Sequence, residues 1–519
     1  MSRLFLMLLC LSVCWGLCRA EEPGAGLSLR ETGVCWLDPE KTTEDSVVVS
    51  RNHRHVALIE KTIESCRVLR DGGPEQDYEK IRRPQFSPDG AKLAYIVTEK
   101  GKSAVVENRK IGKRYDEIVP ESLVYSRDSS TLAYVAIDGG KQFAVVGGEE
   151  KDKYDKISEL HLSGDGKRYA VLVPLPNEPG GDPLRDDAFF VDGKRVEGFK
   201  QCQRFGFSPD GSRYAFVAQI GKDGQTAANG MVLMRIVIDG TEVADTGILM
   251  AGPYEYVRFS EDGRRTAYVV GYSRFGEAYV VVDGERSGPY MFCSQPRFSP
   301  SGKTVAWISA SADESVCHVN GTVWKTVTAN AFGTWGSDSE FAFSATETVA
   351  FTTKEEAKGT RGHVVENDVP QKVYDFVSDL KYDAAGRLCY IAQLGKQAML
   401  IRGGEAEKSF ECERLSKKNW RLYLSDDGKL AALVLPAGGG NFVAMEGRTT
   451  DPLGKVIASQ PLIEHAVIPD PNVHIMGGPM EDPLLWGKRP TLACFNPEGG
   501  LDLIVLRDGK LIHIEVREK

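Results

Sequence analysis

Few residues of this sequence form a pattern typical of a reactive or metal-binding site, and His53 and His55 are the first of them. Because one residue separates them, they would lie on the same face of a strand, where two imidazoles can ligate zinc. No third ligand with suitable spacing accompanies them, so we interpret them as a solvated turn pair. The sequence therefore indicates no metal site.

The sequence also shows neither a reactive pattern of cysteines nor a familiar catalytic motif. Cysteines beyond residue 20 show neither the spacing of a disulfide framework nor that of a metal site. Cys389 and Cys494 alternate with apolar residues as in a buried second strand, where a free thiol behaves as a small hydrophobe. The chain has no Gly-x-Ser-x-Gly elbow, no His-Glu-x-x-His and no phosphate loop. We therefore predict no catalytic residues, no cofactor and no enzyme.

An eleven-fold repeat supplies the elements that would position any functional residue. Its fullest copy, Phe-Ser-Pro-Asp-Gly at residues 207–211, continues into an apolar stretch. The copies begin about 44 residues apart on average, a period typical of β-propeller blades. They begin at Val49, Phe86, Tyr125, Leu162, Phe207, Phe259, Phe298, Phe343, Tyr382, Leu424 and, more loosely, Trp486.

Each copy predicts four strands joined by tight turns. One strand ends at the aromatic-serine pair, where proline presets φ, aspartate bonds back to nearby amides and glycine accepts positive φ. A later β-branched run ends in Asp-Gly, as at Asp192, Asp239 and Asp283, and this dipeptide suits a type I′ hairpin. The sequence therefore predicts an all-β propeller of about ten or eleven four-stranded repeats.

The repeat resembles that of the TolB-type, WD-repeat-like propellers of exported bacterial proteins, in which Phe-Ser-Pro-Asp-Gly followed by Ala-Tyr is the hallmark. The resemblance covers residues 49–454 well and residues 455–519 poorly. It implies a propeller protein of the bacterial envelope and carries over no catalytic residue. We interpret the serine, aspartate and glycine of the motif as turn chemistry.

The number of repeats exceeds the four to eight blades of the usual ring. Two packed rings divided near residue 252, or one large ring, would accommodate them, and we favour two rings. The predicted organisation is a signal peptide at 1–20, a lead-in at 21–48, propeller repeats at 49–454, and an irregular insertion with a degenerate final blade at 455–519.

The first twenty residues predict export. Arg3 gives a basic start, Leu4 to Leu17 is an apolar core, and Cys18-Arg19-Ala20 is a small-x-small cleavage site. We therefore expect a periplasmic or extracellular protein that is cleaved after Ala20. No later stretch is apolar for long enough to predict a transmembrane segment in the mature chain.

The charge balance bears on the partner. The chain has 64 lysines and arginines against 73 acidic residues, a formal net charge of −9, and its basic residues are scattered singly. This balance argues against nucleic acid as a ligand. We expect the partner to be another exported protein or an envelope protein.

Three residues just before repeat starts are the candidates for binding. Arg258 and Arg297 immediately precede Phe259 and Phe298, and Gln295 lies nearby. At the end of an innermost strand, such side chains reach the mouth of the ring channel. The alternative is that each arginine satisfies carbonyl groups or an aspartate between blades.

Two classes of function remain open. One is a non-enzymatic scaffold that binds a protein or an envelope component through irregular segments on a rigid ring, chiefly 219–252 and 455–485. The other is a propeller enzyme, such as a lyase or a glycoside hydrolase, whose carboxylates converge on the channel. We favour the scaffold, because the chain shows no catalytic constellation and leaves no room for an appended catalytic domain.

Overall fold

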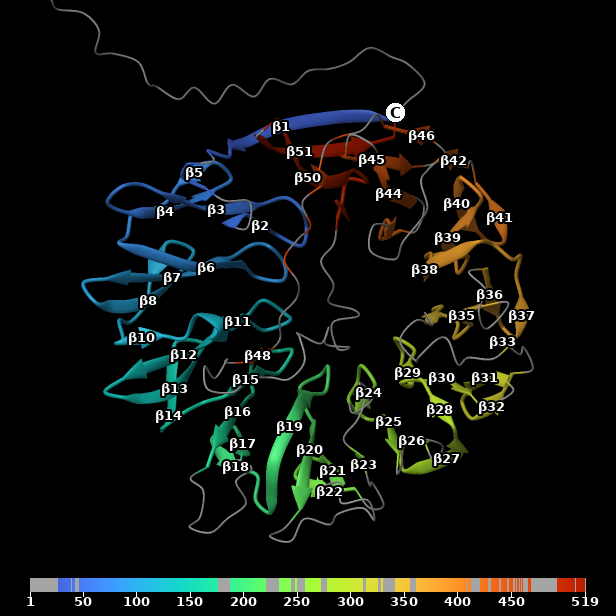
Figure 1. The fold of residues 1–519 in the computed structure, drawn as a ribbon, viewed down its shortest axis with the longest axis horizontal. Helices are drawn as coiled ribbons and strands as arrows, with labels where there is room; N and C mark the ends of the chain where they lie inside the picture. The colour runs from blue at the N-terminus through green and yellow to red at the C-terminus, as the bar shows by residue number, and fades with distance from the viewer. Residues whose placement is uncertain are drawn as a thin grey trace, which may run out of the picture.

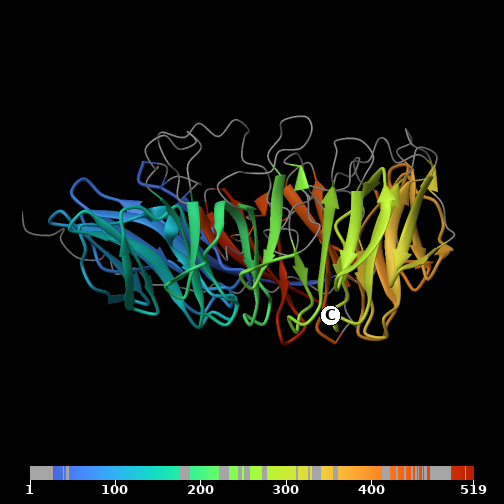
Figure 2. The same ribbon diagram turned by 90° about the horizontal axis from the view of Figure 1, so that it is seen from below.

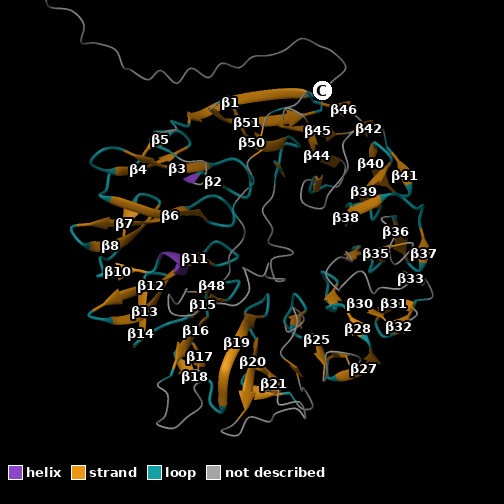
Figure 3. Ribbon diagram, viewed as in Figure 1, coloured by secondary structure: helices purple, strands orange, loops and turns teal. Residues whose placement is uncertain are grey.

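Strands and the turns between them make up almost all of the described chain, together with a short 3-10 helix, η2 (Pro120–Ser122) (Figure 3). The structure is a computed structural model that describes residues 27–518 with internal gaps. Among the described residues, no helix has the length and apolar composition of a membrane span. The longest gaps are 176–186, 221–232, 250–256, 330–340, 412–420 and 468–491.

The strands group into blades of four to six antiparallel strands, numbered along the chain, and two of these blades are joined through β23 into one nine-stranded sheet. Blade 1 contains β2 (Val48–Val49), β3 (Val56–Lys61), β4 (Cys66–Arg70) and β5 (Gly73–Pro74). Blade 2 contains β6 (Lys80–Phe86), β7 (Leu93–Glu99), β8 (Lys102–Glu107) and β9 (Lys110–Ile111). Blade 3 contains β10 (Glu117–Ile118), β11 (Val124–Tyr125), β12 (Leu132–Asp138), β13 (Lys141–Val146) and β14 (Glu149–Tyr154). Blade 4 contains β15 (Glu159–Leu162), β16 (Tyr169–Pro174), β17 (Asp187–Val191), β18 (Lys194–Arg195) and, from much later in the chain, β48 (His465–Val467).

The middle blades follow the same plan. Blade 5 contains β19 (Phe199–Phe207), β20 (Tyr214–Ile220), β21 (Leu233–Ile238) and β22 (Thr241–Glu242). Blade 6 contains β24 (Arg258–Phe259), β25 (Thr266–Gly271), β26 (Ala278–Val282) and β27 (Glu285–Tyr290), and β23 (Ile248–Leu249) bridges it to blade 5. Blade 7 contains β28 (Phe292–Cys293), β29 (Arg297–Phe298), β30 (Val305–Ala310), β31 (Glu314–Val319), β32 (Thr322–Val323) and β33 (Thr328–Ala329). Blade 8 contains β34 (Phe341–Phe343), β35 (Val349–Lys354), β36 (Gly362–Glu366) and β37 (Val369–Pro370).

The last three blades bring the two ends of the described chain together. Blade 9 contains β38 (Phe376–Tyr382), β39 (Leu388–Leu394), β40 (Gln397–Arg402), β41 (Glu405–Ala406) and β42 (Phe410–Glu411). Blade 10 contains β43 (Arg421–Leu424), β44 (Ala431–Ala437), β45 (Gly440–Met445) and β46 (Arg448–Thr449). Blade 11 contains β47 (Lys455–Val456), β49 (Cys494–Phe495), β50 (Leu501–Arg507), β51 (Lys510–Arg517) and β1 (Ser28–Trp36).

The eleven blades form a single ring (Figures 1 and 2). An apolar cluster lies between each described blade and the next, as where Ala267 of blade 6 meets Trp307 of blade 7. The last cluster joins Ile504 of blade 11 to Leu58 of blade 1 and so completes the circuit. Our preference for two packed rings is therefore wrong, because each blade face is already buried against a neighbour in one closed series. Residue 252, the expected boundary, lies outside the described residues.

The ring is closed by strands from both ends of the described chain. β1 pairs antiparallel with β51 from Ser28 to Trp36, with one register shift between Gly33 and Cys35. Blade 11 thus takes its outermost strand from the N-terminal side and its inner strands from the C-terminal side. The propeller predicted from the repeat is confirmed.

The repeated motif marks the end of the first strand in ten blades, at the predicted starts from Val49 to Leu424. In blade 11 the first strand ends at Phe495, which is followed by Asn-Pro-Glu-Gly, so the final copy begins there and not at Trp486. Trp486 itself lies outside the described residues. Cys494 accordingly lies in a first strand and is half-buried, whereas Cys389 is buried in a second strand as expected.

The predicted turn chemistry is confirmed. In the motif of blade 5, Ser208 Oγ donates a hydrogen bond to Asp210 Oδ1 at 2.5 Å, and Gly211 has a φ of 73°. The Asp-Gly hairpins have positive φ at both residues, with 50° at Asp192 and 79° at Gly193. A type I′ turn requires this conformation.

An arginine at one repeat position joins each of three blade pairs, and these are Arg168, Arg213 and Arg265. Arg265 Nε donates to Asp283 Oδ2 of its own blade at 2.8 Å. Its Nη1 donates to the carbonyl oxygens of Gly302 and Lys303 in blade 7, and its Cζ lies 5.1 Å from the ring centroid of Phe298. These arginines therefore stabilise the contacts between neighbouring blades.

Candidate functional site

The first strands of the blades lie on the inner side of the ring, and we call the surface that they form the inner wall (Figure 1). The chain as a whole has a net charge of −9. The described strands of this wall nevertheless hold ten basic residues, Lys80, Arg82, Arg83, Lys200, Arg204, Arg258, Arg297, Lys381, Arg421 and Lys455. Against these stand three acidic residues, Glu117, Glu159 and Asp379. The strands of the inner wall thus hold more basic than acidic residues, in contrast to the chain as a whole.

The predicted binding candidates lie on this wall. Arg258 is the first residue of β24 and Arg297 the first residue of β29, and these two strands contact each other across blades 6 and 7. Gln295 lies between β28 and β29, and all three side chains are half-buried. Sequence reasoning missed Arg204 on blade 5, although a basic residue shortly before a repeat start was the signal in each case. Whether these residues bind a ligand stays a prediction.

Three long strands of the inner wall, β6, β19 and β38, contain a β-bulge at the same place. The residue three positions before the terminal aromatic has positive φ in each, 55° at Arg83, 60° at Arg204 and 59° at Asp379. A bulge re-aims a side chain and interrupts the strand edge. Asp379 turns to blade 10, where its Oδ2 accepts a hydrogen bond from Leu422 N at 2.6 Å, whereas Arg83 is exposed.

The insertion between β47 and β49 runs along the inner wall. Gln460 N donates to Val49 O of blade 1 at 3.0 Å. Its side chain binds both backbone groups of Phe86 in blade 2, with Oε1 3.0 Å from the nitrogen and Nε2 2.5 Å from the oxygen. Further on, β48 pairs with β15, the short unbulged strand of blade 4. The segment expected to be irregular thus crosses from blade 11 to blade 4, and its residues 468–491 lie outside the described chain.

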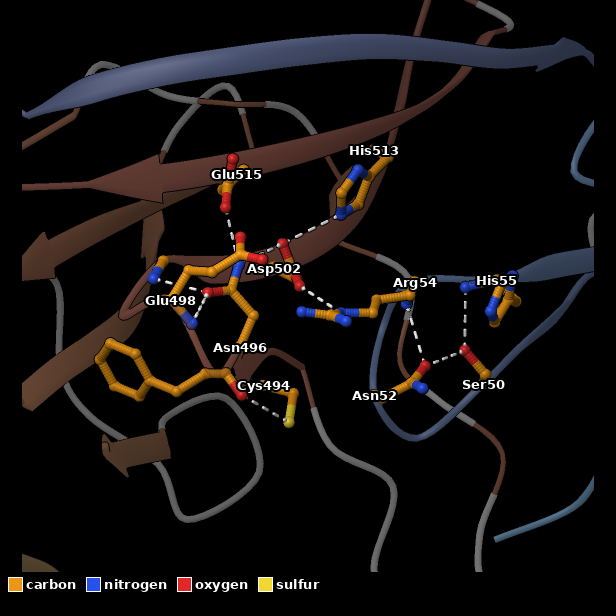
Figure 4. Close-up of polar contacts among 12 residues, drawn as sticks. Ser50, Asn52, Arg54, His55, Cys494, Asn496, Glu498, Asp502, His513 and Glu515 are labelled. Carbon is orange, nitrogen blue, oxygen red and sulfur yellow. Dashed lines mark hydrogen bonds and ion pairs between the residues drawn. The ribbon is translucent and has the colours of Figure 1, made fainter. Parts of the chain in front are cut away.

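A buried polar network fastens blade 11 to blade 1 (Figure 4). Asp502 on β50 is 2 % exposed, and its Oδ2 accepts a hydrogen bond from Arg54 Nε of blade 1 at 3.1 Å. The other oxygen, Oδ1, lies 3.1 Å from His513 Nε2 on β51. A charge-assisted contact at this place helps to close the ring, because Arg54 and Asp502 come from opposite ends of the chain.

Glu515 lies directly across the sheet from Asp502, which places two buried carboxylates next to each other. Asn496 Nδ2 donates to both, at 3.3 Å to Asp502 Oδ1 and 2.7 Å to Glu515 Oε1, and Arg517 donates to Glu515 at 2.7 Å. Burial alone would raise the pKa of Glu515, but the hydrogen bonds from Arg517 and Asn496 outweigh it and hold that pKa below its ordinary value. Both carboxylates are thus engaged in bonds that shape blade 11.

The two predicted turn histidines differ in their surroundings. His55 is half-buried and its Nδ1 lies 2.8 Å from Asp71 Oδ2, whereas His53 is fully buried. The interpretation as a solvated pair is therefore wrong for His53. The physical reason is that neighbouring turns pack together, as where Asn52 Nδ2 donates to Asp89 O of blade 2 at 2.9 Å. Among the described residues, no group of three or more His, Cys, Asp or Glu could hold a metal ion.

The seven described cysteines are free thiols. Burial raises the pKa of Cys202 and of Cys293 to about 12. Neither is therefore a thiolate nucleophile at neutral pH, because reactivity requires the deprotonated sulfur. Cys412 lies outside the described residues.

No protein-family model and no curated protein matches this chain. Among solved structures, the β-propeller domain of the trilobed protease from Pyrococcus furiosus is 16 % identical, with a TM-score of 0.25, over 52 % of this chain and 90 % of that one. TolB from Acinetobacter baumannii is 13 % identical, with a TM-score of 0.21, over 51 % and 77 %. Dihydro-heme d1 dehydrogenase NirN is 15 % identical, with a TM-score of 0.31, over 78 % and 72 %. These likenesses concern the propeller fold alone, and the TolB-type family stays an expectation.

Proposed function

We propose that this chain is an exported, non-enzymatic binding protein whose rigid ring holds another exported protein or an envelope component at its inner wall. The observation that carries the proposal is the excess of ten basic over three acidic residues on that wall in a chain of net charge −9. An excess of positive charge on one surface suits an anionic group of a partner.

Binding of labelled polyanions tests the proposal. The mature protein is titrated into fluorescein-labelled decaglutamate, oligogalacturonate or decalysine at low ionic strength, and fluorescence anisotropy is followed. We expect the polyanions to bind with an affinity that falls as salt screens the charges. Binding of decalysine would report the net charge of −9 and not the inner wall, so it serves as the comparison for the variants below. Failure of every polyanion to bind would refute an anion-binding wall.

Two double variants of equal charge locate the binding. R258Q/R297Q removes two positive charges from the inner wall, and K110Q/R264Q removes two from exposed positions on an outer strand and a turn. We expect the first variant to weaken polyanion binding and the second to leave it nearly unchanged. Equal losses would show that the overall charge, and not the wall, attracts the ligand.

A screen for turnover addresses the alternative of a propeller enzyme. The protein is incubated with glycoside, ester, peptide and polyuronate substrates, and we expect no product. Turnover that is abolished by one Asp, Glu or His substitution on the inner wall would replace the scaffold by an enzyme.

Export is tested by the intact mass of the protein recovered after expression with its own N-terminus. We expect a chain that begins at Glu21, because the basic start, apolar core and small-x-small site agree. Loss of Arg3 and Arg19 with the leader would shift the net charge from −9 to about −11. A mass that retains residues 1–20, or that carries a lipid, would reject this cleavage.

A further inference from the structure

The β-bulge of β6 places two arginines next to each other on the inner wall of blade 2. Arg82 pairs with Ile96 and Gln85 with Ala94, so three steps along β6 oppose two steps along β7. The bulge contains Arg83, which has a φ of 55° and an exposed side chain. Bulges are frequent beside binding sites because they re-aim a side chain that a regular strand would turn to a sheet face.

Two polar atoms beside this bulge are buried and have no hydrogen-bond partner in the described part of the chain. They are Nε of Arg82 and Oε1 of Gln85, and Gln85 is 7 % exposed. The residues opposite them, Ile96 and Ala94, belong to one apolar cluster between blades 2 and 3, so Arg82 and Gln85 lie on the same face of β6. Folded proteins pair nearly all of their buried polar atoms. An unpaired donor and an unpaired acceptor thus lie on one face of β6, next to the exposed Arg83, and mark the place where a ligand would supply the missing partners.

The chemistry of these two atoms restricts the ligand. The guanidinium of Arg82 needs an acceptor, and a carboxylate is the acceptor that matches it best. The amide oxygen of Gln85 needs a donor, which a sulfate or chloride ion does not have. An acidic peptide has both, a side-chain carboxylate and backbone N–H groups, and the exposed Arg83 adds a second cation for its charge.

The inner wall next to this site already binds polypeptide. The side-chain amide of Gln460 binds both backbone groups of Phe86, the residue that follows Gln85. Two blades further, β48 of the same insertion pairs with β15 as an added strand; Figure 1 shows β48 on the inner side of blade 4. Between blades 2 and 4, the inner wall thus binds peptide groups and extended backbone. This favours a peptide over a sugar acid as the ligand.

We propose that Arg82, Arg83 and Gln85 form a binding site for an acidic peptide segment of the partner. The two arginines hold a carboxylate of the segment, and Gln85 accepts a hydrogen bond from its backbone. This inference rests on the proposed function and deepens it, because it names the ligand class and one place on the wall.

The test uses the full mature chain and fluorescein-labelled decaglutamate, with the variants R82Q, R83Q and Q85L. K110Q, on the outer strand of the same blade, is the charge-matched control. We expect R82Q and R83Q each to weaken binding about tenfold, as loss of one charge-assisted contact would, and K110Q to weaken it less than about twofold. Q85L removes an unpaired buried acceptor, so we expect the same or a higher urea midpoint together with weaker decaglutamate binding.

The outcomes separate this site from the broader proposal. If R82Q fails to fold, R83Q still decides, because its side chain is exposed. Unchanged binding in R82Q, R83Q and Q85L, with loss in R258Q/R297Q, would overturn this site and leave the anion-binding wall standing. Tighter binding of oligogalacturonate than of decaglutamate would overturn the peptide assignment. Absence of polyanion binding by the unaltered protein would refute the proposed function and this site with it.

Discussion

Substitution of Gly263 by alanine should destabilise the ring at the contact between two turns. Gly263 closes the motif turn of blade 6 with a φ of 67°. A Cβ atom added there would lie 2.3 Å from Oδ1 and 2.8 Å from Cγ of Asp210, in the corresponding turn of blade 5. Real Cβ contacts are not this short, so one of the two turns must move.

Asp210 cannot move away without loss. Its Oδ1 accepts hydrogen bonds from Ser208 Oγ at 2.5 Å and from Ser212 N at 3.2 Å, and these bonds form its own turn. Positive φ costs alanine about 1 kcal/mol relative to glycine. Overpacking against a fixed neighbour adds about 1–3 kcal/mol. We therefore expect G263A to lower the free energy of unfolding by about 2–4 kcal/mol.

Gly386 provides the matched control. It occupies the same place in the motif turn of blade 9, with a φ of 77°, but a Cβ there would meet no atom within 4 Å. G386A should therefore cost only the conformational term of about 1 kcal/mol. G211A should fall between the two, because its Cβ would lie 3.0 Å from Ser163 and from Asp165 of blade 4.

Urea unfolding followed by tryptophan fluorescence measures the three effects. The midpoints are compared directly, because a ring of eleven blades need not unfold in one step. We expect the order G263A, G211A, G386A from the lowest midpoint to the highest. Equal midpoints for G263A and G386A would show that the motif turns of blades 5 and 6 are not in close contact. That result would refute the packing of these blades.

Three further predictions concern the joints of the ring and its response to acid. R265Q should lower the free energy of unfolding by about 1–3 kcal/mol, because it loses the hydrogen bonds to Asp283 and to the carbonyl oxygens of blade 7. The control R264Q, whose side chain is 85 % exposed, should change that free energy by less than about 0.5 kcal/mol. Q460A should lower the urea midpoint, because Gln460 bonds the insertion to Val49 and Phe86, whereas the exposed control Q397A should leave it unchanged. Equal midpoints for the two variants would contradict this prediction. Burial lowers the pKa of His318 to about 4, while the unfolded imidazole titrates near 6.5. The stability that the neutral His318 contributes is thus fully present above pH 6.5 and is lost as the pH falls toward 4. The urea midpoint should therefore decline less between pH 7 and 4.5 in H318N than in the unaltered protein. An identical decline in both proteins would exclude His318 as a cause.

Much of the fold follows from local chemistry that the sequence shows. The turn at 208–211 needs a serine, an aspartate and a glycine at fixed spacing, and each Asp-Gly hairpin needs two residues that accept positive φ. Such requirements are met within a few residues of chain, so the repeat could be read copy by copy. The last copy was misplaced because Asn496 and Glu498 replace the serine and aspartate, and because a long insertion separates it from Leu424.

The candidate site was predicted only in part for a related reason. Arg258, Gln295 and Arg297 were found because each lies next to a strong motif. Arg82, Arg83 and Gln85 lie just before a motif of equal strength and were missed, because nothing local shows that β6 bulges or that two of its polar atoms remain unpaired. Bulges depend on the register between two strands, which a single strand does not reveal.

A propeller of about eleven repeats could be inferred from the sequence, because period, turns and strand patterning are local and repeat along the chain. That the repeats form one ring became evident only in the structure, since it depends on which blade faces pack together and on the pairing of β1 with β51 from the other end of the chain. It also decided that an acidic chain has a basic inner wall, because the charges come from strands far apart in sequence. Only closure of the ring brings those strands to one surface.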